Sequence, residues 1–278
     1  MRLERATLLN RLAKKCAAPL SYLLCSRLLH NPARAFDAYL NFLLGRGAGT
    51  GWDLQHEIQT AQSCVHSERP IVFDVGANIG DWSKGFLAAM PQARLFMLEP
   101  SPGCQSRIQA LNLSNATLIP CAVGDRAGKA SLHFSSDIDG SASLHARGDS
   151  YFQNRNYQTV EVEVTTIDEL LAQHQIEFVD FMKMDIEGHE LAALQGAATA
   201  LKQQRIGALS FEFGSGNINS RTYFRDFWEL LSAHNFRLAR ITPGGRLVPV
   251  DDYYEDCEYF RGVTNYIAQL KNHPKKRA

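Results

Sequence analysis

The sequence predicts an α/β fold built on a doubly wound, mostly parallel sheet. Six short apolar runs follow one another between residues 71 and 268, and several are separated by segments with helical periodicity. Strands that are apolar on both faces and alternate with helices are typical of a buried parallel sheet. Right-handed crossovers then place helices on both faces of that sheet. A chain of 278 residues, 45% hydrophobic and 21% charged, has the size and composition of a globular protein with one large domain.

The expected elements follow a regular order along the chain. The runs predicted as strands are 71–75, 95–98, 116–123, 178–184, 208–213 and 263–268. The segments predicted as helices between them are 79–90, 102–112 and 189–201. Two extra strands, 130–134 and 160–164, flank a polar loop over 135–158. A loop of this length inside a compact domain is usually functional or disordered.

The first 48 residues differ from the rest in pattern and in charge. They predict two or three helices and carry eight Arg or Lys against Glu4 and Asp37, a local excess of six positive charges. A glycine-rich segment over 45–51 then breaks the pattern. The predicted organisation is a basic helical extension over 1–50, an α/β domain over 51–270 and a basic tail over 271–278.

Composition and charge exclude several classes of function. The net charge is zero, and no nucleic-acid recognition motif is present. The six cysteines include no Cys-x-x-Cys pair, so neither a disulfide framework nor a zinc site is expected. The longest uncharged stretch near the N-terminus, 16–26, contains Pro19 and is too short to span a bilayer. We therefore expect a cytoplasmic protein with reduced thiols and no nucleic-acid partner.

The strand 71–75 runs into a glycine turn, the strongest local signal in the sequence. Residues 73–80 read Phe-Asp-Val-Gly-Ala-Asn-Ile-Gly. Gly76 and Gly80 let the backbone approach a ligand closely, and the helix that starts nearby offers free amide groups. The pattern Gly-x-Gly-x-x-Gly is absent because Ala77 and Asn78 occupy the relevant positions. A dinucleotide with a pyrophosphate is therefore disfavoured.

An acidic residue ends the next predicted strand. Glu99 lies 25 residues after Asp74, where a carboxylate can accept hydrogen bonds from both hydroxyls of a ribose. The third run ends in the small residues 121–125, where an adenine ring can lie flat or the chain simply turns. The glycine turn and the acid together describe a ligand that carries a nucleoside but needs no phosphate.

The fourth predicted strand ends in a cluster of ionisable residues, Asp185, Glu187, His189 and Glu190. This is the carboxyl edge of the sheet, where ligands bind in such folds. Three interpretations stay open: a general base, for which the ordinary pKa of His189 suits neutral pH; a divalent cation site formed by Asp185, Glu187 and His189; or simple helix capping. Glu212, at the end of the fifth run, points into the same crevice or into solvent.

Five motifs in order along the chain resemble the FkbM-type methyltransferases. They occupy 73–80, 98–100, 122–124, 166–168 and 183–190, and the match runs over about residues 70–270. The resemblance implies a class I methyltransferase (Rossmann-like) fold with a seven-stranded sheet and S-adenosylmethionine as methyl donor. The N-terminal extension and the loop 135–158 lie outside it. The domain over 51–270 is thus expected to be a methyltransferase domain.

The same resemblance assigns expected roles to individual residues. Those expected to bind the donor are Asp74, Gly76, Asn78, Gly80, Glu99, Ala122 and Asp185. Glu187 and His189 would lie nearest the acceptor, and Asn265 falls where the last strand of the family carries a similar asparagine. We expect His189 or Asp185 to take the acceptor proton, while Glu187 orients the acceptor or helps to hold a divalent metal.

The expected acceptor is a hydroxyl of a sugar, glycan or glycolipid. Alternatives are a secondary metabolite, or a non-catalytic donor-binding or scaffold role, against which the polar groups of 185–190 argue. The aromatic and acidic segment 253–260 predicts either part of a sugar site or a partly buried, solvated loop. The basic helices of 1–48 predict peripheral contact with an anionic membrane, a cap packed over the domain, or a transit peptide. Oligomeric state does not follow from the sequence.

Overall fold

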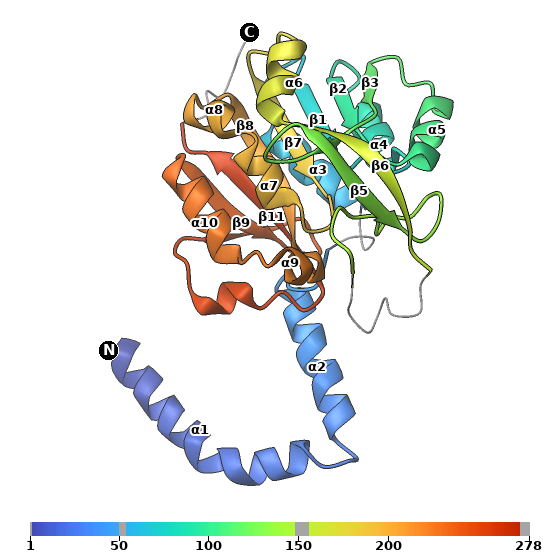
Figure 1. Ribbon diagram of the computed structural model, residues 1–278. Helices are drawn as coiled ribbons and strands as arrows, with labels where there is room; N and C mark the ends of the chain where they lie inside the picture. The colour runs from blue at the N-terminus through green and yellow to red at the C-terminus, as the bar shows by residue number, and fades with distance from the viewer. Residues whose placement is uncertain (1, 50–53, 148–155, 273–278) are drawn as a thin grey trace.

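The central sheet confirms the predicted fold class. A computed structural model describes residues 2–49, 54–147 and 156–272, with the backbone alone for 2–12. The sheet has the strand order β10-β9-β11-β8-β7-β1-β2-β3 (Figure 1). The five strands from β3 to β8 are parallel, and β11 is antiparallel to both of its neighbours. The resemblance implied seven strands, and the eighth is β10, which pairs only with β9 at the edge.

Five of the six predicted apolar runs agree with observed strands to within two residues. The strands of the sheet are β1 Ile71–Val75, β2 Arg94–Leu98, β3 Ala116–Ile119, β7 Val179–Met184, β8 Ile206–Gly214, β9 Phe236–Ile241, β10 Leu247–Val250 and β11 Val263–Leu270. The run 116–123 was wrongly predicted as one strand, because Pro120 separates β3 from β4 (Ala122–Val123). The strands β9 and β10 were not predicted.

Helices cover both faces of the sheet and bury a separate apolar core on each. On one face lie α3 (Leu54–Cys64), α4 (Asp81–Ala89) and α5 (Pro102–Ala110). On the other lie α6 (Ile167–Gln173), α7 (Glu190–Gln195), α8 (Ala198–Lys202) and α10 (Phe224–Ala233). The helix predicted over 189–201 is therefore two short helices. The carboxyl edge also carries α9 (Ser215–Ser220) and the 3-10 turn Glu255–Glu258.

The two extra strands form a second sheet of their own. Its order is β4-β6-β5, with β5 over Gly128–Phe134 and β6 over Gln158–Thr165. Ala122, Leu132 and Val162 form its small buried core. The loop after β5 folds back on it, since His133 and Ser143 exchange both backbone hydrogen bonds, at 2.8 and 3.0 Å. Residues 148–155 of the predicted loop lie outside the described part of the chain.

Two helices precede the domain and project from it (Figure 1). They are α1 (Arg2–Leu24) and α2 (His30–Leu43). Two ion pairs join the C-terminal half of α2 and the residues after it to the domain: Arg261–Asp37 and Arg46–Asp256. Because large apolar side chains from Leu20 to Leu44 stay exposed, the interpretation of this extension as a cap packed over the domain is wrong. The predicted tail lies, from residue 273 onward, outside the described residues.

Candidate active site

Two cavities meet at the carboxyl edge of the central sheet. The first, of about 620 Å³, lies between the ends of β1, β2 and β7, the strand β4, and the loop 135–147. The second, of about 350 Å³, lies on the face of the sheet that packs against α3 and α4. Asp185, directly after β7, lines both cavities.

The glycine turn after β1 brings the backbone of two strands together. Gly76 has a φ of +80°, and a Cβ on it would lie 1.9 Å from the carbonyl oxygen of Asp185. Its amide and that of Ala77 donate to the carbonyl of Leu98 at the end of β2. Only glycine fits this position, because both the left-handed conformation and the contact exclude a side chain. The turn thereby fixes the distance between the ends of β1 and β7.

Glu99 lines the first cavity with a buried carboxylate. One oxygen accepts a hydrogen bond from the amide of Asn78 and the other from the amide of Ser101, both at 2.8 Å. Burial raises the pKa of Glu99 to about 7, although both amide hydrogen bonds oppose this. Each carboxylate oxygen can accept a second hydrogen bond. The group can therefore still receive two hydroxyl donors from the cavity side.

The loop after β5 forms one wall of the first cavity. Asp139 accepts hydrogen bonds from the amides and hydroxyls of both Ser135 and Ser141, at 2.6–2.8 Å. Although burial raises the pKa of Asp139, these four bonds lower it to about 2. The wall also contributes Ala142 and Leu144, which face Ala122 and Val123 across the cavity. This end of the cavity is accordingly apolar.

The segment 185–190 forms a tight turn rather than a continuous helix. Glu190 is fully buried, and its carboxylate accepts the amides of Ile186 and Gly188 at 2.9–3.3 Å. Burial raises the pKa of Glu190 to about 7. Gly188 has a φ of +100°, and a Cβ there would lie 2.5 Å from the carbonyl oxygen of Gly216. Glu190 therefore closes the turn before α7 and does not cap that helix, whose N-cap residue His189 makes no side-chain cap hydrogen bond.

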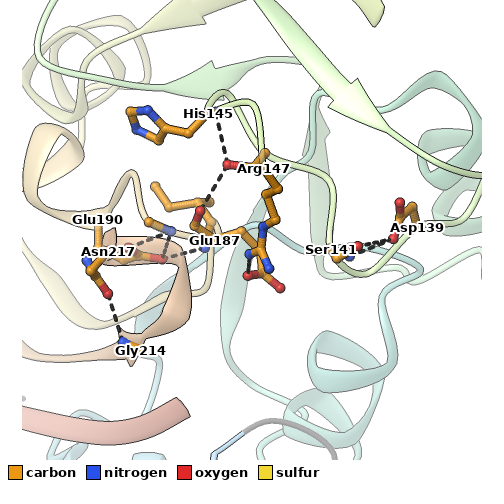
Figure 2. A network of polar contacts seen from close by, with 11 residues as sticks. Asp139, Ser141, His145, Arg147, Glu187, Glu190, Gly214 and Asn217 are labelled. Carbon is orange, nitrogen blue, oxygen red and sulfur yellow. Dashed lines mark hydrogen bonds and ion pairs between the residues drawn. The ribbon is translucent and has the colours of Figure 1, made fainter. Parts of the chain in front are cut away.

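Glu187 contacts Arg147 of the loop (Figure 2), and His189 contacts His145 of the same loop. Glu187 has a left-handed φ of +55° and pairs with Arg147, while its carbonyl accepts the hydroxyl of Ser143 at 2.9 Å. Burial raises the pKa of Glu187 to about 7, although Arg147 opposes this. The Nδ1 of His189 lies 3.0 Å from the Nε2 of His145. Burial and His145 lower the pKa of His189 to about 4.

A buried lysine, Lys183, lines the second cavity close to the glycine turn. The Nζ of Lys183 lies 3.3 Å from Asp74, 3.4 Å from Asp185 and 3.4 Å from the carbonyl oxygen of Gly76. Although burial disfavours its charge, the carboxylates of Asp74 and Asp185 raise the pKa of Lys183. Asp74 is fully buried and also accepts the hydroxyl of Ser83 at 2.6 Å. Burial raises the pKa of Asp74.

The second cavity is polar at its open end. Asn265 on β11 donates to Glu57 on α3 at 2.6 Å, and its own amide oxygen is buried without a hydrogen-bond partner. Burial, followed by repulsion from Asp185 and other acids, raises the pKa of Glu212 well above its usual range. The rest of the wall contains Lys183 and Ser210 together with apolar residues, among them Trp82.

Most of the residues predicted from sequence come together here. The first cavity is lined by Gly76, Asn78, Glu99, Ala122, Asp185, Glu187 and His189, whereas the second is lined by Asp185, Glu212 and Asn265. Asp74 lies beneath the cavities and Gly80 packs against Met97 and Leu111, so neither is among the lining residues.

The structure does not assemble every predicted arrangement. Within the described residues no group of three His, Cys, Asp or Glu side chains is disposed to hold a metal ion. The candidate set Asp185, Glu187 and His189 diverges toward Lys183, Arg147 and His145. The segment 253–260 lines neither cavity; its Tyr253 donates to Glu258, which also accepts the amides of Phe224 and Arg225 at the start of α10.

Several site residues were not predicted. Asp139, His145 and Arg147 come from the loop, and Glu57 comes from a helix that no motif marked. The only signal for Asp139 was local, because serine and aspartate spaced as in 135–141 are typical of hydrogen-bonded turns. Nothing in the sequence joins Arg147 to Glu187, since that pair depends on how the loop folds back.

The sequence was compared with known families and with curated proteins. A family model described as the Methyltransferase FkbM domain matches residues 74–238. The 2-O-methyltransferase NoeI of Sinorhizobium fredii is 27% identical over 156 residues, 52% of this chain and 64% of that protein. The hexuronic acid methyltransferase AglP of Haloferax volcanii is 26% identical, over 49% of this chain and 53% of that protein. The matches thus span less than two thirds of either relative.

Solved structures give a weaker comparison. The crystal structure of a methyltransferase FkbM from Methylobacillus flagellatus is 19% identical, with a TM-score of 0.46, over 73% of this chain and 44% of that one. A putative methyltransferase from Streptococcus mutans, SMU.1697c in complex with SAH, is 11% identical, with a TM-score of 0.41, over 78% of this chain and 95% of that one.

Proposed function

Because this chain belongs to the FkbM methyltransferase family, we propose that it is an S-adenosylmethionine-dependent O-methyltransferase acting on a sugar hydroxyl. The observation that carries the proposal is the first cavity, in which the glycine turn after β1 and the buried acid after β2 lie at the ends of adjacent parallel strands, with apolar residues of β4 in the same cavity. A relative named as a 2-O-methyltransferase and another named for hexuronic acid support a hydroxyl of a sugar as the acceptor.

The residues of the first cavity fit the donor. Glu99 has one lone pair left on each oxygen for the two ribose hydroxyls, since each oxygen accepts one amide. Ala122, Val123 and Leu144 leave a flat apolar space for adenine. Gly76 brings the backbone to the cavity wall without a side chain. The donor supplies a methyl group already activated on a positively charged sulfur, beside which the carboxylate of Asp185 is favourable.

We assign the acceptor to the second cavity, because Asp185 is the residue that separates it from the first. Glu57, Glu212 and Asn265 offer carboxyl and amide groups that match the hydroxyls of a sugar. The orphaned amide oxygen of Asn265 is suited to accept one of those hydroxyls. The main role of the chain is to hold the acceptor oxygen in line with the methyl group, and such orientation is worth up to about 7–11 kcal/mol.

We assign the general base to Asp185 rather than to His189. The ring of His189 contacts His145, and its Nε2 lies against Gly124 at the β4 end of the first cavity. A positioned base contributes about 10²–10⁴-fold to the rate. Glu187 then has a different role, because its pair with Arg147 holds the loop 135–147 over the donor cavity and keeps water out.

The test combines donor binding with methyl transfer. Calorimetry compares S-adenosylmethionine, its demethylated product and NAD, and labelled donor is then offered with a panel of sugars and metabolites, with and without chelator. Glu99→Gln should weaken donor binding about tenfold or more, the value of a hydrogen bond to a charged group. The control Glu163→Gln changes an exposed carboxylate outside both cavities and should leave binding unchanged.

Asp185→Asn tests the base at saturating donor, because Asp185 also lines the donor cavity. It should lower turnover about 10²–10⁴-fold at saturating donor. Binding of NAD instead of S-adenosylmethionine would refute the donor assignment. Wild-type turnover by Asp185→Asn at saturating donor would refute the base, and transfer only to acceptors without a sugar would refute the acceptor class.

A further inference from the structure

The N-terminal helices carry most of the exposed apolar side chains. Of 16 large hydrophobic residues that are exposed in the described chain, ten lie between Leu20 and Leu44. In α2 they are Phe36, Tyr39, Leu40 and Leu43, with Leu44 just after it, all 44–64% exposed. Spacings of three and four residues place them on one side of the helix. This apolar stripe of α2 has no partner among the described elements.

The back of α2 is the side that attaches to the body. Asp37 pairs with Arg261, and Asn41 is buried. The backbone carbonyl of Leu44 accepts a hydrogen bond from Arg240 at 2.8 Å. The helix is therefore fixed to the domain along one side and presents its apolar stripe on another, as an amphipathic helix docked only through its polar side would.

Charge indicates what covers the stripe. Residues 1–48 carry an excess of six positive charges, and the acid Asp37 is already paired. Lys14, Lys15, Arg27 and Arg34 are exposed. Two copies meeting through these segments would bring like charges together, whereas an anionic bilayer attracts them. An apolar stripe flanked by basic residues, with Tyr among the apolar ones, is typical of a helix that lies in the membrane interface.

The position of α2 relates this surface to the site. Gly49 donates to the carbonyl of Val263, and Ala48 lines a small cavity together with Glu57 and Asn265. Glu57 and Asn265 also line the second cavity. The C-terminal end of α2 thus lies beside the second cavity, the proposed acceptor site, and the helices project from there (Figure 1). Within the described residues no helix is long and apolar enough to cross a bilayer.

We infer that the stripe of α2, together with Lys14 and Lys15 of α1, forms an anchor that lies on an anionic membrane surface. The anchor holds the second cavity near the lipid headgroups, so the sugar acceptor is carried by the membrane. This last step rests on the proposed function, whereas the anchor itself does not.

Vesicle flotation of the full chain tests the anchor. The protein should float with vesicles of phosphatidylcholine and phosphatidylglycerol but not with phosphatidylcholine alone, and added salt should weaken binding. Lys14→Gln with Lys15→Gln should lower the partition coefficient roughly 25-fold, at about fivefold for each charge near the surface. Phe36→Ser with Leu43→Ser should lower it about tenfold or more.

The matched control removes one aromatic and one aliphatic side chain elsewhere. Tyr223→Ser with Ile218→Ser changes side chains of similar exposure, 65% and 62%, outside the anchor and should not alter flotation. Calorimetry with S-adenosylmethionine checks the fold of every variant. Equal recovery of the full chain with both vesicle types overturns the anchor. The anchor is also overturned if Phe36→Ser with Leu43→Ser floats as well as the wild type. If the full chain does not float but forms a dimer, and Phe36→Ser with Leu43→Ser abolishes that dimer, the anchor is likewise overturned.

The outcomes for anchor and function are separable. Loss of donor binding with intact flotation overturns only the proposed function. Flotation together with equal methyl transfer to a free sugar and to the same sugar on a lipid keeps the anchor and overturns the membrane-borne acceptor.

Discussion

Replacing Lys183 by methionine should destabilise the fold strongly while keeping the apolar stem of the side chain. The ammonium group lies 3.3 Å from Asp74, which is fully buried, and 3.4 Å from Asp185. Without the ammonium group, the carboxylate of Asp74 keeps the hydroxyl of Ser83 as its hydrogen-bond donor among the described residues. Breaking a buried ion pair from one side costs about 3–5 kcal/mol, because a buried charge is left uncompensated.

The expected shift in Tm follows from the size of the chain. An unfolding entropy of about 2.1 cal/mol/K per residue gives about 0.6 kcal/mol/K for 278 residues. A loss of about 3–5 kcal/mol then lowers Tm by roughly 5–9 °C. Burial already raises the pKa of Asp74 above 3.8, and removing Lys183 raises it further. The folded variant therefore binds more protons than the unfolded chain, and its stability falls as pH rises through the folded pKa of Asp74.

Urea and thermal unfolding at several pH values measure both effects. Asp74→Asn combined with Lys183→Met removes both charges and should recover most of the loss. Lys129→Met is the control, since Lys129 also faces two acids, Glu161 and Glu163, but on the exposed surface. It should leave Tm unchanged. A Tm for Lys183→Met within a degree or so of the wild type, or no recovery in the double variant, would refute the reasoning.

Two further predictions concern the turn and the loop. Gly76→Ala should cost at least about 1–2 kcal/mol for the left-handed backbone, and it should abolish donor binding because the new Cβ would meet the carbonyl of Asp185. The control Gly262→Ala is also at positive φ, but the space around its Cβ is open, so donor binding should be kept. Calorimetry and urea unfolding check both variants. Burial and His145 lower the pKa of His189 from 6.5 to about 4, so folding stability should fall as pH falls from about 6.5 to about 4. His189→Gln should flatten this dependence of the unfolding free energy on pH, as measured by urea unfolding. An unchanged slope in the variant would contradict the prediction.

The parallel strands were predictable because burial on both faces leaves a continuous apolar run. β1, β2 and β7 read largely in this way, although buried charged residues interrupt β1 and β7, and polar residues that line the cavities follow each strand. β9 was missed because it lies toward the sheet edge and alternates apolar residues with Arg237 and Arg240. The break between β3 and β4 depends on Pro120, whose effect on a strand is readable in principle.

The site was predictable only where main-chain topology alone brings residues together. The carboxyl ends of neighbouring parallel strands must meet, so Gly76, Glu99 and Asp185 could be grouped from sequence. The contacts of Arg147 with Glu187 and of His145 with His189 join a loop to a turn about 40 residues away in the sequence. No local pattern encodes such a pairing. The depth of Asp74 likewise follows from strand parity, because its side chain points to the α4 face, toward Ser83.

The backbone of the turn after β7 explains why its acids have separate roles. Glu190 accepts the amides of Ile186 and Gly188, which closes the turn and holds Glu187 in its left-handed conformation. That conformation directs Glu187 to Arg147 in the loop, so its carboxylate is engaged on the side away from the second cavity. Asp185 precedes the turn and is the acid that lines both cavities. A substitution of Glu190 should therefore act through the position of Glu187, whereas a substitution of Asp185 acts directly on both cavities.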